Sequence, residues 1–543
     1  MIRPILRSDS GFAAMIAILM IGMLTLLGLA ALSTSDDEVN IAGNELQEMR
    51  AFYAAEAGLE AAAAALQTEF DSTGLPPAVM PAATREINNC AVTYATADDG
   101  PATQDVLSTG PLSGLHALVK SFTITSTADN TIDHGRIELS QSYQVALVPI
   151  FQFAVFYDDD LEIAPGPDMT LNGRVHTNGN MWLQSNNSLQ MDSYVTSAGD
   201  IYHGRKGAGG AGSGDVLIKD PLGNDVSMKE GAGWLDANDS HWYDSSVARW
   251  RGRVQDSEHG QEELNVPLSA SSSGDPHRLI DRGSGNPDSY ENLATLKFID
   301  GQAFRKAGGV WTDVTAAMTA ASVIAYNNNK FTDQREGAQV DVLELNVDLM
   351  YSQGYAPANG VVYFADSTSD YPALRLRNGS QLGAGLTVAS ANPVYTLGNY
   401  NSTNKKPAAI MADAVTFLSN SWDDSKSSLA KSDRPASNTT VNAAYLTGNT
   451  ETTDVNYNGG FENLPRFLEE WSGKSFTWRG SAICLWYSEQ ADGDWNGTYY
   501  SPPNRNWAYD TDLDDPTKLP PETPMVRVFQ RVGWKQNYVG TSF

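Results

Sequence analysis

The sequence is poor in cysteine and in basic residues, and it lacks familiar catalytic motifs. Cys90 and Cys484 are the only cysteines among 543 residues, which excludes a disulfide-rich scaffold. Lysine and arginine number 36 against 65 aspartates and glutamates, and the formal net charge of -29 argues against nucleic acid or anionic lipid as partners of the soluble part. Because H-E-x-x-H and paired-cysteine spacings are missing, no zinc site is predicted, and the serine-nucleophile motif G-x-S-x-G is missing too.

Charge is also absent from one long stretch near the N-terminus. Residues 12–32 contain no charged side chain, and as a helix at about 1.5 Å per residue they span about 30 Å, the thickness of a bilayer's hydrocarbon core. Apolar residues then recur every three or four positions up to Phe70, without an intervening proline. We therefore predict a helix over residues 12–74 that crosses a membrane and ends before Pro76 and Pro77.

Three interpretations of this stretch compete. A cleaved secretory signal has a shorter apolar region, of roughly 7–15 residues. A plain membrane anchor explains Arg3 and Arg7 before the span, but neither the Gly11-Phe12 junction nor the long helical extension. The third rests on the whole pattern, because a basic leader, a Gly-Phe junction and an apolar span that continues as an amphipathic helix resemble the class III signal of type IV pilins. The segment ending in AFYAAEAGLEAA further resembles the N-terminal domain of PilX-type minor pilins.

This resemblance implies how the chain is processed and where it acts. Prepilin peptidase would cleave between Gly11 and Phe12, removing a leader of residues 1–11 and leaving Phe12 to be methylated. Most major pilins carry a glutamate as the fifth mature residue, whereas this chain has Ile16 there. In the family that carboxylate neutralises the N-terminal ammonium of a neighbour, since a buried unpaired charge is costly. A subunit without it suits the first position of a filament, so we expect a tip or initiation role.

The resemblance also implies location and partners. The chain would be a single-pass bacterial inner-membrane protein, held by residues 12–32 with its bulk outside the cytoplasm, and later part of a pilus at the cell surface. Its partners would be prepilin peptidase, other minor and major pilins, and a large tip adhesin. We predict a minor pilin that supports pilus assembly and adhesion, and not an enzyme. One alternative is a tip-class pseudopilin of a type II secretion system, which shares the signal.

The remainder predicts an α+β protein with a mostly β body. Residues 75–150 alternate between apolar and polar side chains, as in 119–125 and 137–145, and predict a small pilin-like layer of strands packed on the helix. Leu161, Met181 and Ile201 are then spaced by twenty residues. Short strands at a fixed period are typical of a parallel β-helix, with an array of β-hairpins as the alternative.

We predict that this β-helix-like body covers residues 151–437 and is interrupted by an insertion at about 204–351. The aromatic-rich residues 438–543 are expected to cap the coil, because its last turn would otherwise expose an open edge. Residues 151–180, 385–424 and 461–490 also resemble segments of large PilX-type chains.

Calcium is the only cofactor that the sequence suggests. The first half of a calcium loop is matched by Asp492, Asp494 and Asn496. Pro503 stands where the closing glutamate belongs, and a second alternating set follows at Asp510, Asp512 and Asp514.

Two further sets of residues have a candidate role. In an oxidising periplasm Cys90 and Cys484 could form one long-range bridge, or both could be buried free thiols. A second functional alternative, an anchored β-helical carbohydrate-binding protein or enzyme, would draw its carboxylate pair from Asp158, Asp159, Asp160, Glu162 and Asp168.

Overall fold

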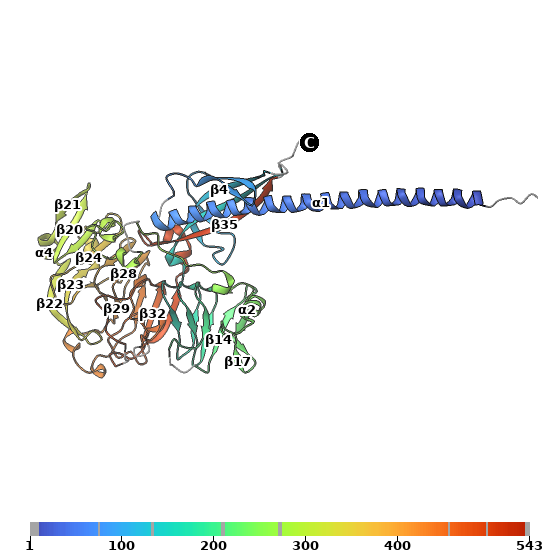
Figure 1. The fold of residues 1–543 in the computed structure, drawn as a ribbon. Coiled ribbons are helices and arrows are strands. Elements are labelled where there is room, and N and C mark those ends of the chain that lie inside the picture. Colours follow the sequence, from blue (N-terminus) through green and yellow to red (C-terminus); the bar gives the residue numbers. More distant parts are fainter. Residues whose placement is uncertain are drawn as a thin grey trace, which may run out of the picture.

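The computed structural model describes residues 10–73, 76–131, 135–207, 212–269, 274–453, 457–495 and 498–537. It begins with one long helix, α1 (Ser10–Thr73), and continues mostly as strands. Strand makes up 38% of the chain and helix 22%, which confirms the predicted long helix followed by a mostly β body. Figure 1 shows the N-terminal half of α1 extending far beyond the rest of the molecule.

The character of α1 changes along its length. Its first part is apolar on all sides, which is the composition of a membrane span. Its last part has small side chains on one face, and Ala51, Ala55, Leu59 and Ala62 are buried against a sheet. The helix ends just before Pro76, as predicted.

That sheet is antiparallel and has the order β1-β2-β4-β5-β35, with β3 paired to β4. The strands predicted over 119–125 and 137–145 lie within β4 and β5. Alternate residues of β4 and β5 are buried against α1. The bounds are β1 (Ala82–Ile87), β2 (Cys90–Asp98), β3 (Thr103–Val106), β4 (His116–Asn130), β5 (Arg136–Pro149) and β35 (Met525–Asn537).

Strand β35 comes from the end of the chain and pairs antiparallel with β5. Its Arg531 forms a two-pronged ion pair with Glu60 of α1, at 2.7 Å for both contacts. The side chain of Arg527 donates to the carbonyl of Phe70. The end of the chain therefore completes the small sheet, a role that the predicted cap over 438–543 did not include.

The twenty-residue repeat is present as a first coil of parallel strands. Leu161 lies opposite Met181, which lies opposite Ile201, and all three side chains are fully buried. Each turn contributes one strand to each of three faces. The first face holds β6 (Val155–Tyr157), β9 (Val175–Thr177), β12 (Val195–Ser197) and β18 (Val254–Gln255); the second β7 (Leu161–Ile163), β10 (Met181–Leu183) and β13 (Ile201–His203); the third β8 (Met169–Leu171), β11 (Ser188–Met191), β14 (Asp215–Lys219) and, antiparallel at its edge, β15 (Asp225–Ser227).

Turn residues of the first coil explain why the repeat is so regular. The carboxylate of Asp160 accepts from the backbone N–H of Asn180 at 2.8 Å, and the Asn180 side chain accepts from the N–H of Asp200 at 2.9 Å. A Cβ on Gly199 would lie 2.6 Å from the Asn180 side-chain oxygen, so only glycine fits beside this ladder. The polar positions of the repeat thus hold the backbone register from one turn to the next.

A second coil follows, built mainly of parallel strands on the same plan. Its first face contains β19 (Leu296–Ile299), β24 (Val361–Ala365), β26 (Leu386–Ser390), β28 (Ala408–Ala412), β31 (Ala444–Thr447) and β33 (Ala482–Cys484). Its other faces contain β22 (Ile324–Asp333), β23 (Ala338–Asn346), β25 (Pro372–Arg377), β27 (Val394–Leu397) and β29 (Val415–Leu418), and then β30 (Thr439–Asn442), β32 (Ser475–Gly480) and β34 (Asn504–Tyr509). The smaller elements are β16 (Lys229–Glu230), β17 (Gly233–Trp234), β20 (Gln302–Ala307), β21 (Val310–Asp313), α2 (Trp242–Trp250), α3 (Tyr290–Leu293), α4 (Thr315–Ala320) and α5 (Val347–Ser352).

The two coils join through β6 and β33, which pair in parallel. The first face is therefore one sheet of order β18-β12-β9-β6-β33-β31-β28-β26-β24-β19, extended by the antiparallel β20 and β21. The chain enters at the middle with β6, winds outward to β18, resumes at the far end with β19, and winds back to β33. We call the β6–β33 junction the seam, and we call residues 256–269 and 274–295, which lie between β18 and β19 in the chain, the connecting segment.

This path corrects two predicted boundaries. Residues 204–351 are not an insertion, because β14 and β18 continue the first coil and β19 to β23 begin the second. Residues 438–509 do not cap the coil, because β31 and β33 lie at the centre of the long sheet. The pattern could not reveal this order, since one turn of strands has the same apolar pattern at the end of a coil as at its middle.

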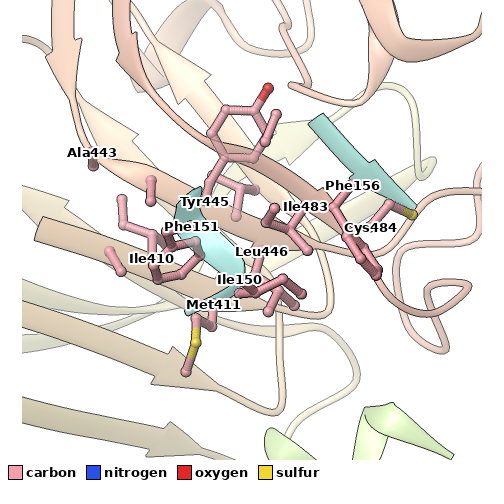
Figure 2. Packing of buried hydrophobic residues seen from close by; sticks show 14 of the residues in the cluster. Ile150, Phe151, Phe156, Ile410, Met411, Ala443, Tyr445, Leu446, Ile483 and Cys484 are labelled. Carbon is pink, nitrogen blue, oxygen red and sulfur yellow. The ribbon is translucent and has the colours of Figure 1, made fainter. Parts of the chain in front are cut away.

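A short segment fastens the small sheet to the seam. The 3-10 turn η1 (Ile150–Gln152) directly follows β5, and Ile150 and Phe151 are fully buried. Met411, Leu446 and Ile483 share one face of the long sheet in register, and Figure 2 shows Ile150 beside Met411 and Leu446. The long sheet and the small sheet are therefore joined by a continuous apolar core.

Candidate functional site

The first candidate site is the N-terminal part of α1, where the predicted cleavage junction lies. Gly11 and Phe12 lie in the first two turns of the helix, and Phe12 is 66% exposed. The most apolar part of the helix has no residue buried, and it is long and apolar enough to cross a membrane. Ile16, the predicted filament-core position, is also exposed on this part.

The second half of α1 is held very close to the sheet. A Cβ on Gly58 would lie 2.2 Å from the Ser126 hydroxyl and 2.7 Å from a methyl of Val92. By contrast, a Cβ on Gly43 would meet nothing within 4 Å. One helix thus presents a free apolar half and a half that is locked to a folded domain.

A cavity of about 350 Å³ opens at the seam, and it is the second candidate site. Its walls come from the residues after β6, from the connecting segment and from the residues after β33. Acidic side chains predominate on the walls: Asp158, Asp159, Asp160, Glu162, Asp275 and Glu489. Four of these acids are the ones suggested as a carboxylate pair, whereas Asp168 does not line this cavity but accepts from Asn187 at 2.6 Å.

Each of the four acids accepts a hydrogen bond from a neighbouring side chain. Asp158 accepts from Asn178 at 2.7 Å, and burial raises the pKa of its carboxyl. Asp160 pairs with Lys206 at 2.7 Å. The remaining two accept from tyrosine hydroxyls, Asp159 from Tyr487 and Glu162 from Tyr457. The two tyrosine hydrogen bonds link loops of the first coil to loops of the second, so Asp159 and Glu162 help to hold the seam together.

The two acidic sets suggested as a calcium site lie in different surroundings. Beside Asp492 and Asp494, the N–H of Gly493 donates to Glu336 at 2.7 Å, and Asn496 lies outside the described residues. Lys405 pairs with Asp510 at 2.6 Å and with Asp512 at 2.7 Å.

Lysines occupy the position that a cation would take in the second set. Lys518 is also 2.8 Å from Asp512, and hydrogen bonds from the two lysines lower the pKa of Asp512 to about 2. The carboxylate of Asp514 accepts from the Tyr509 hydroxyl at 2.7 Å. A calcium ion that used Asp510 and Asp512 would have to displace these lysines.

The two cysteines are free thiols in different parts of the molecule. Cys90 begins β2 in the small sheet, whereas Cys484 ends β33 at the seam. Both are buried, and burial raises the pKa of both thiols. Of the two possibilities left open by the sequence, the structure shows the buried thiols and not the bridge.

One group of side chains was missed from the sequence. His277, Asp281 and Glu489 each bring one potential metal-ligating atom within 4.8 Å of the others. The His-x-x-x-Asp spacing of the first two was a readable signal, because residues four apart meet on a helical turn. Glu489 lies more than two hundred residues away, and only the seam brings it to the others.

Two buried glutamates near the seam make stability depend on pH. Glu469 is 1% exposed and accepts from the N–H and hydroxyl of Ser419, both at 2.6 Å. Burial raises the pKa of Glu469 to about 7, and it does the same for Glu462. The folded-state pKa lies above the ordinary value of 4.5, so folding favours the protonated carboxyl of Glu469. The contribution of this group to the free energy of unfolding is therefore fully present below pH 4.5 and is lost as the pH rises through about 7.

We expect Glu469→Gln to raise the melting temperature at pH 8 and to leave it nearly unchanged at pH 4.5. A pKa raised from 4.5 to about 7 corresponds to about 3 kcal/mol at pH 8. Thermal unfolding monitored by circular dichroism from pH 4.5 to 8 measures the difference. Glu470→Gln is the matched control, since hydrogen bonds lower the pKa of the Glu470 carboxyl. Removing that carboxylate should lower the melting temperature at pH 8, which is the opposite of the change expected for Glu469→Gln. An unchanged pH slope in Glu469→Gln would contradict the assignment.

Comparison with known proteins adds little to this geometry. No family model matches the chain, and no curated protein matches it. Among solved structures, the chain is similar to the crystal structure of the competence-associated pilin ComZ from Thermus thermophilus. The two share 12% identity with a TM-score of 0.29, over 90% of this chain and 98% of that chain. A score this low does not establish a common fold.

Proposed function

We propose that the chain is a PilX-type minor pilin that acts at or near the tip of a type IV pilus. The observation that carries the proposal is the two-part helix α1, exposed and apolar in its first half and packed on an antiparallel sheet in its second. Such a helix can pass from a membrane into a bundle of similar helices without refolding. Its locked second half would carry the folded body along.

The proposed life of the chain begins in the bacterial inner membrane, with a single pass over residues 12–32 and the body outside the cytoplasm. Prepilin peptidase removes residues 1–11 and leaves a methylated Phe12. Other minor and major pilins then pack around α1 in a pilus at the cell surface. The acidic body faces the medium, where it could contact a large tip adhesin.

Two features support the tip position. Ile16 offers no carboxylate to neutralise the ammonium of a preceding subunit, which suits a subunit that has none before it. The two coils over residues 155–509 are also far larger than the small sheet that joins them to α1. Repeating such a body along a thin filament would crowd its neighbours. We infer that the coils form a parallel β-helix, which is supported by the parallel register of Leu161, Met181 and Ile201.

Replacing Gly11 tests the cleavage step. We expect Gly11→Leu to block cleavage, so that the chain keeps residues 1–11 and does not enter sheared filaments. Edman sequencing and intact mass of the membrane and filament fractions measure this. Gly22→Leu is the matched control, because a Cβ there also meets nothing within 4 Å and the junction is untouched. A wild-type chain that starts at Met1, or after Leu32, would contradict the proposal.

The filament system and the position within it need separate tests. Immunogold labelling of the coils is expected at filament ends, and labelling along their length would exclude the tip position. Deletion of the chain is expected to reduce piliation. A deletion that spares pili and blocks protein secretion would instead support a type II secretion pseudopilin.

A further inference from the structure

A histidine and two carboxylates meet where the connecting segment crosses the seam. His277 lies in the turn η3 (Pro276–Leu279), and Asp281 follows four residues later. Nδ1 of His277 is 2.8 Å from Oδ1 of Asp281 and 3.9 Å from Oε1 of Glu489. Around a zinc ion, nitrogen and oxygen ligands bind at about 2.0–2.2 Å, so neighbouring ligand atoms lie roughly 3–3.5 Å apart. The three side chains are therefore near the positions that one ion requires.

The other nitrogen of His277 faces a third carboxylate. Nε2 is 3.8 Å from Oδ1 of Asp413 and makes no hydrogen bond to any described residue. Asp413 is fully buried and is held by the backbone N–H groups of Glu489 and Ala491. Histidines that bind metals usually donate their other ring N–H to a carboxylate. Asp413 is the carboxylate placed to accept it, once the 3.8 Å separation shortens.

Independent signs of a ligand come from the cavity wall. The side chain of His277 is buried, and the Trp486 ring packs edge-on against it at 5.4 Å. Two donors on the same wall, the Trp486 indole N–H and the Tyr157 hydroxyl, are buried without a partner among the described residues. Buried donors of this kind require an acceptor, which water molecules coordinated to an ion in the cavity would supply.

The charge around the group favours a cation. Asp158, Asp159 and Asp275 line the cavity together with His277 and Glu489. Asp281 lies on the adjoining pocket beside Arg278 and Arg282, and both arginines have other carboxylate partners. Arg278 lies 3.6 Å from Asp288, and Arg282 lies 3.3 Å from Asp300. These contacts leave the carboxylates of Asp281 and Glu489 on the open side of His277, where water can complete the coordination of an ion.

We propose that His277, Asp281 and Glu489 bind one divalent transition-metal ion, which fastens the connecting segment across the seam. One imidazole nitrogen with two carboxylate oxygens suits Zn²⁺ or a similar ion, whereas Ca²⁺ and Mg²⁺ prefer ligand sets made only of oxygen. The site is separate from α1 and adds a function beyond assembly into a filament. Its position implies that the metal stabilises the junction between the two coils.

Titration of the tag-free full chain with zinc chloride in detergent micelles tests the site. Calorimetry should give one tight site, and zinc should raise the melting temperature. Asp281→Asn and Glu489→Gln should each weaken the zinc Kd at least about tenfold, without changing the circular dichroism spectrum, because both side chains lie at the open rim. Glu258→Gln removes an exposed carboxylate elsewhere on the connecting segment and should leave the Kd unchanged.

Two results would overturn the proposal. One is the absence of zinc binding by the folded wild-type chain, and the other is a zinc Kd that is the same in wild type, Asp281→Asn and Glu489→Gln. Calcium chloride in the same titration separates the metal classes, since calcium should bind this site at least about a hundredfold more weakly. Calcium binding that is as tight as zinc binding, and is lost in Glu489→Gln, would refute the choice of a transition metal.

Discussion

Ending the chain after residue 524, which removes strand β35, should unfold the small sheet and free the second half of α1. Strand β35 pairs with β5 along nearly its whole length. It also supplies buried Val526 and Val528, and Phe529 packs against Tyr143 with ring centres 5.3 Å apart. Each such side chain contributes about 1.5–3 kcal/mol when buried, so the loss is comparable to the whole stability of a small domain.

Hydrogen exchange measured by mass spectrometry distinguishes this effect from general unfolding. Amides of β4 and β5 should lose protection in the shortened chain, whereas amides of β26 and β28 in the second coil should keep it. A chain ending after residue 537 retains β35 and is the matched control. Unchanged protection of β4 and β5 would show that β35 is dispensable.

Gly58→Val is expected to force α1 away from the sheet. The new side chain would overlap the Ser126 hydroxyl and a methyl of Val92. Ser126 lies in β4, whose backbone is hydrogen-bonded to β2 and therefore cannot shift easily. Overpacking of this kind typically costs 1–3 kcal/mol, and more where neither side can move. Gly58→Val should therefore lower the free energy of unfolding by at least about 3 kcal/mol, because neither the helix nor the paired strands can move to make room.

Urea unfolding of the detergent-solubilised chain, followed by the exchange of helix amides over residues 51–70, measures this cost. Gly43→Val places the same side chain on a free part of the helix and should be neutral or slightly stabilising, since valine favours helix over glycine. If Gly58→Val is as stable as Gly43→Val, the close approach of α1 to the sheet is wrong.

The candidate sites show how far residue patterns reach. The i, i+4 pair of His277 and Asp281 is visible in the sequence, because a helical turn places such residues together. Glu489 and Asp413 reach the same point only through the winding of the second coil. The alternating aspartates at 510–514 carry a calcium-like spacing, but Lys405, more than a hundred residues earlier, pairs with Asp510 and Asp512. The spacing of residues shows which side chains could bind a ligand, but only the fold shows which charged side chains lie next to them.

The sequence by itself determined the elements that depend on local periodicity. A run of apolar residues, followed by apolar residues spaced three or four apart, predicts the helix α1, and the pair Pro76 and Pro77 predicts where it ends. The twenty-residue repeat set the register of the first coil, since each turn must stack its apolar side chains on those of the next. These interactions are between residues close in the chain or at a fixed interval.

Only the tertiary structure decided the order in which the turns stack. Strands β6 and β33 expose the same backbone groups as any other turn of a coil, so no local pattern shows that they pair. For the same reason β35 could not be assigned to the edge of the small sheet. Backbone hydrogen bonds carry little sequence information, and the partner of an open strand edge is chosen by which apolar surfaces can be buried together.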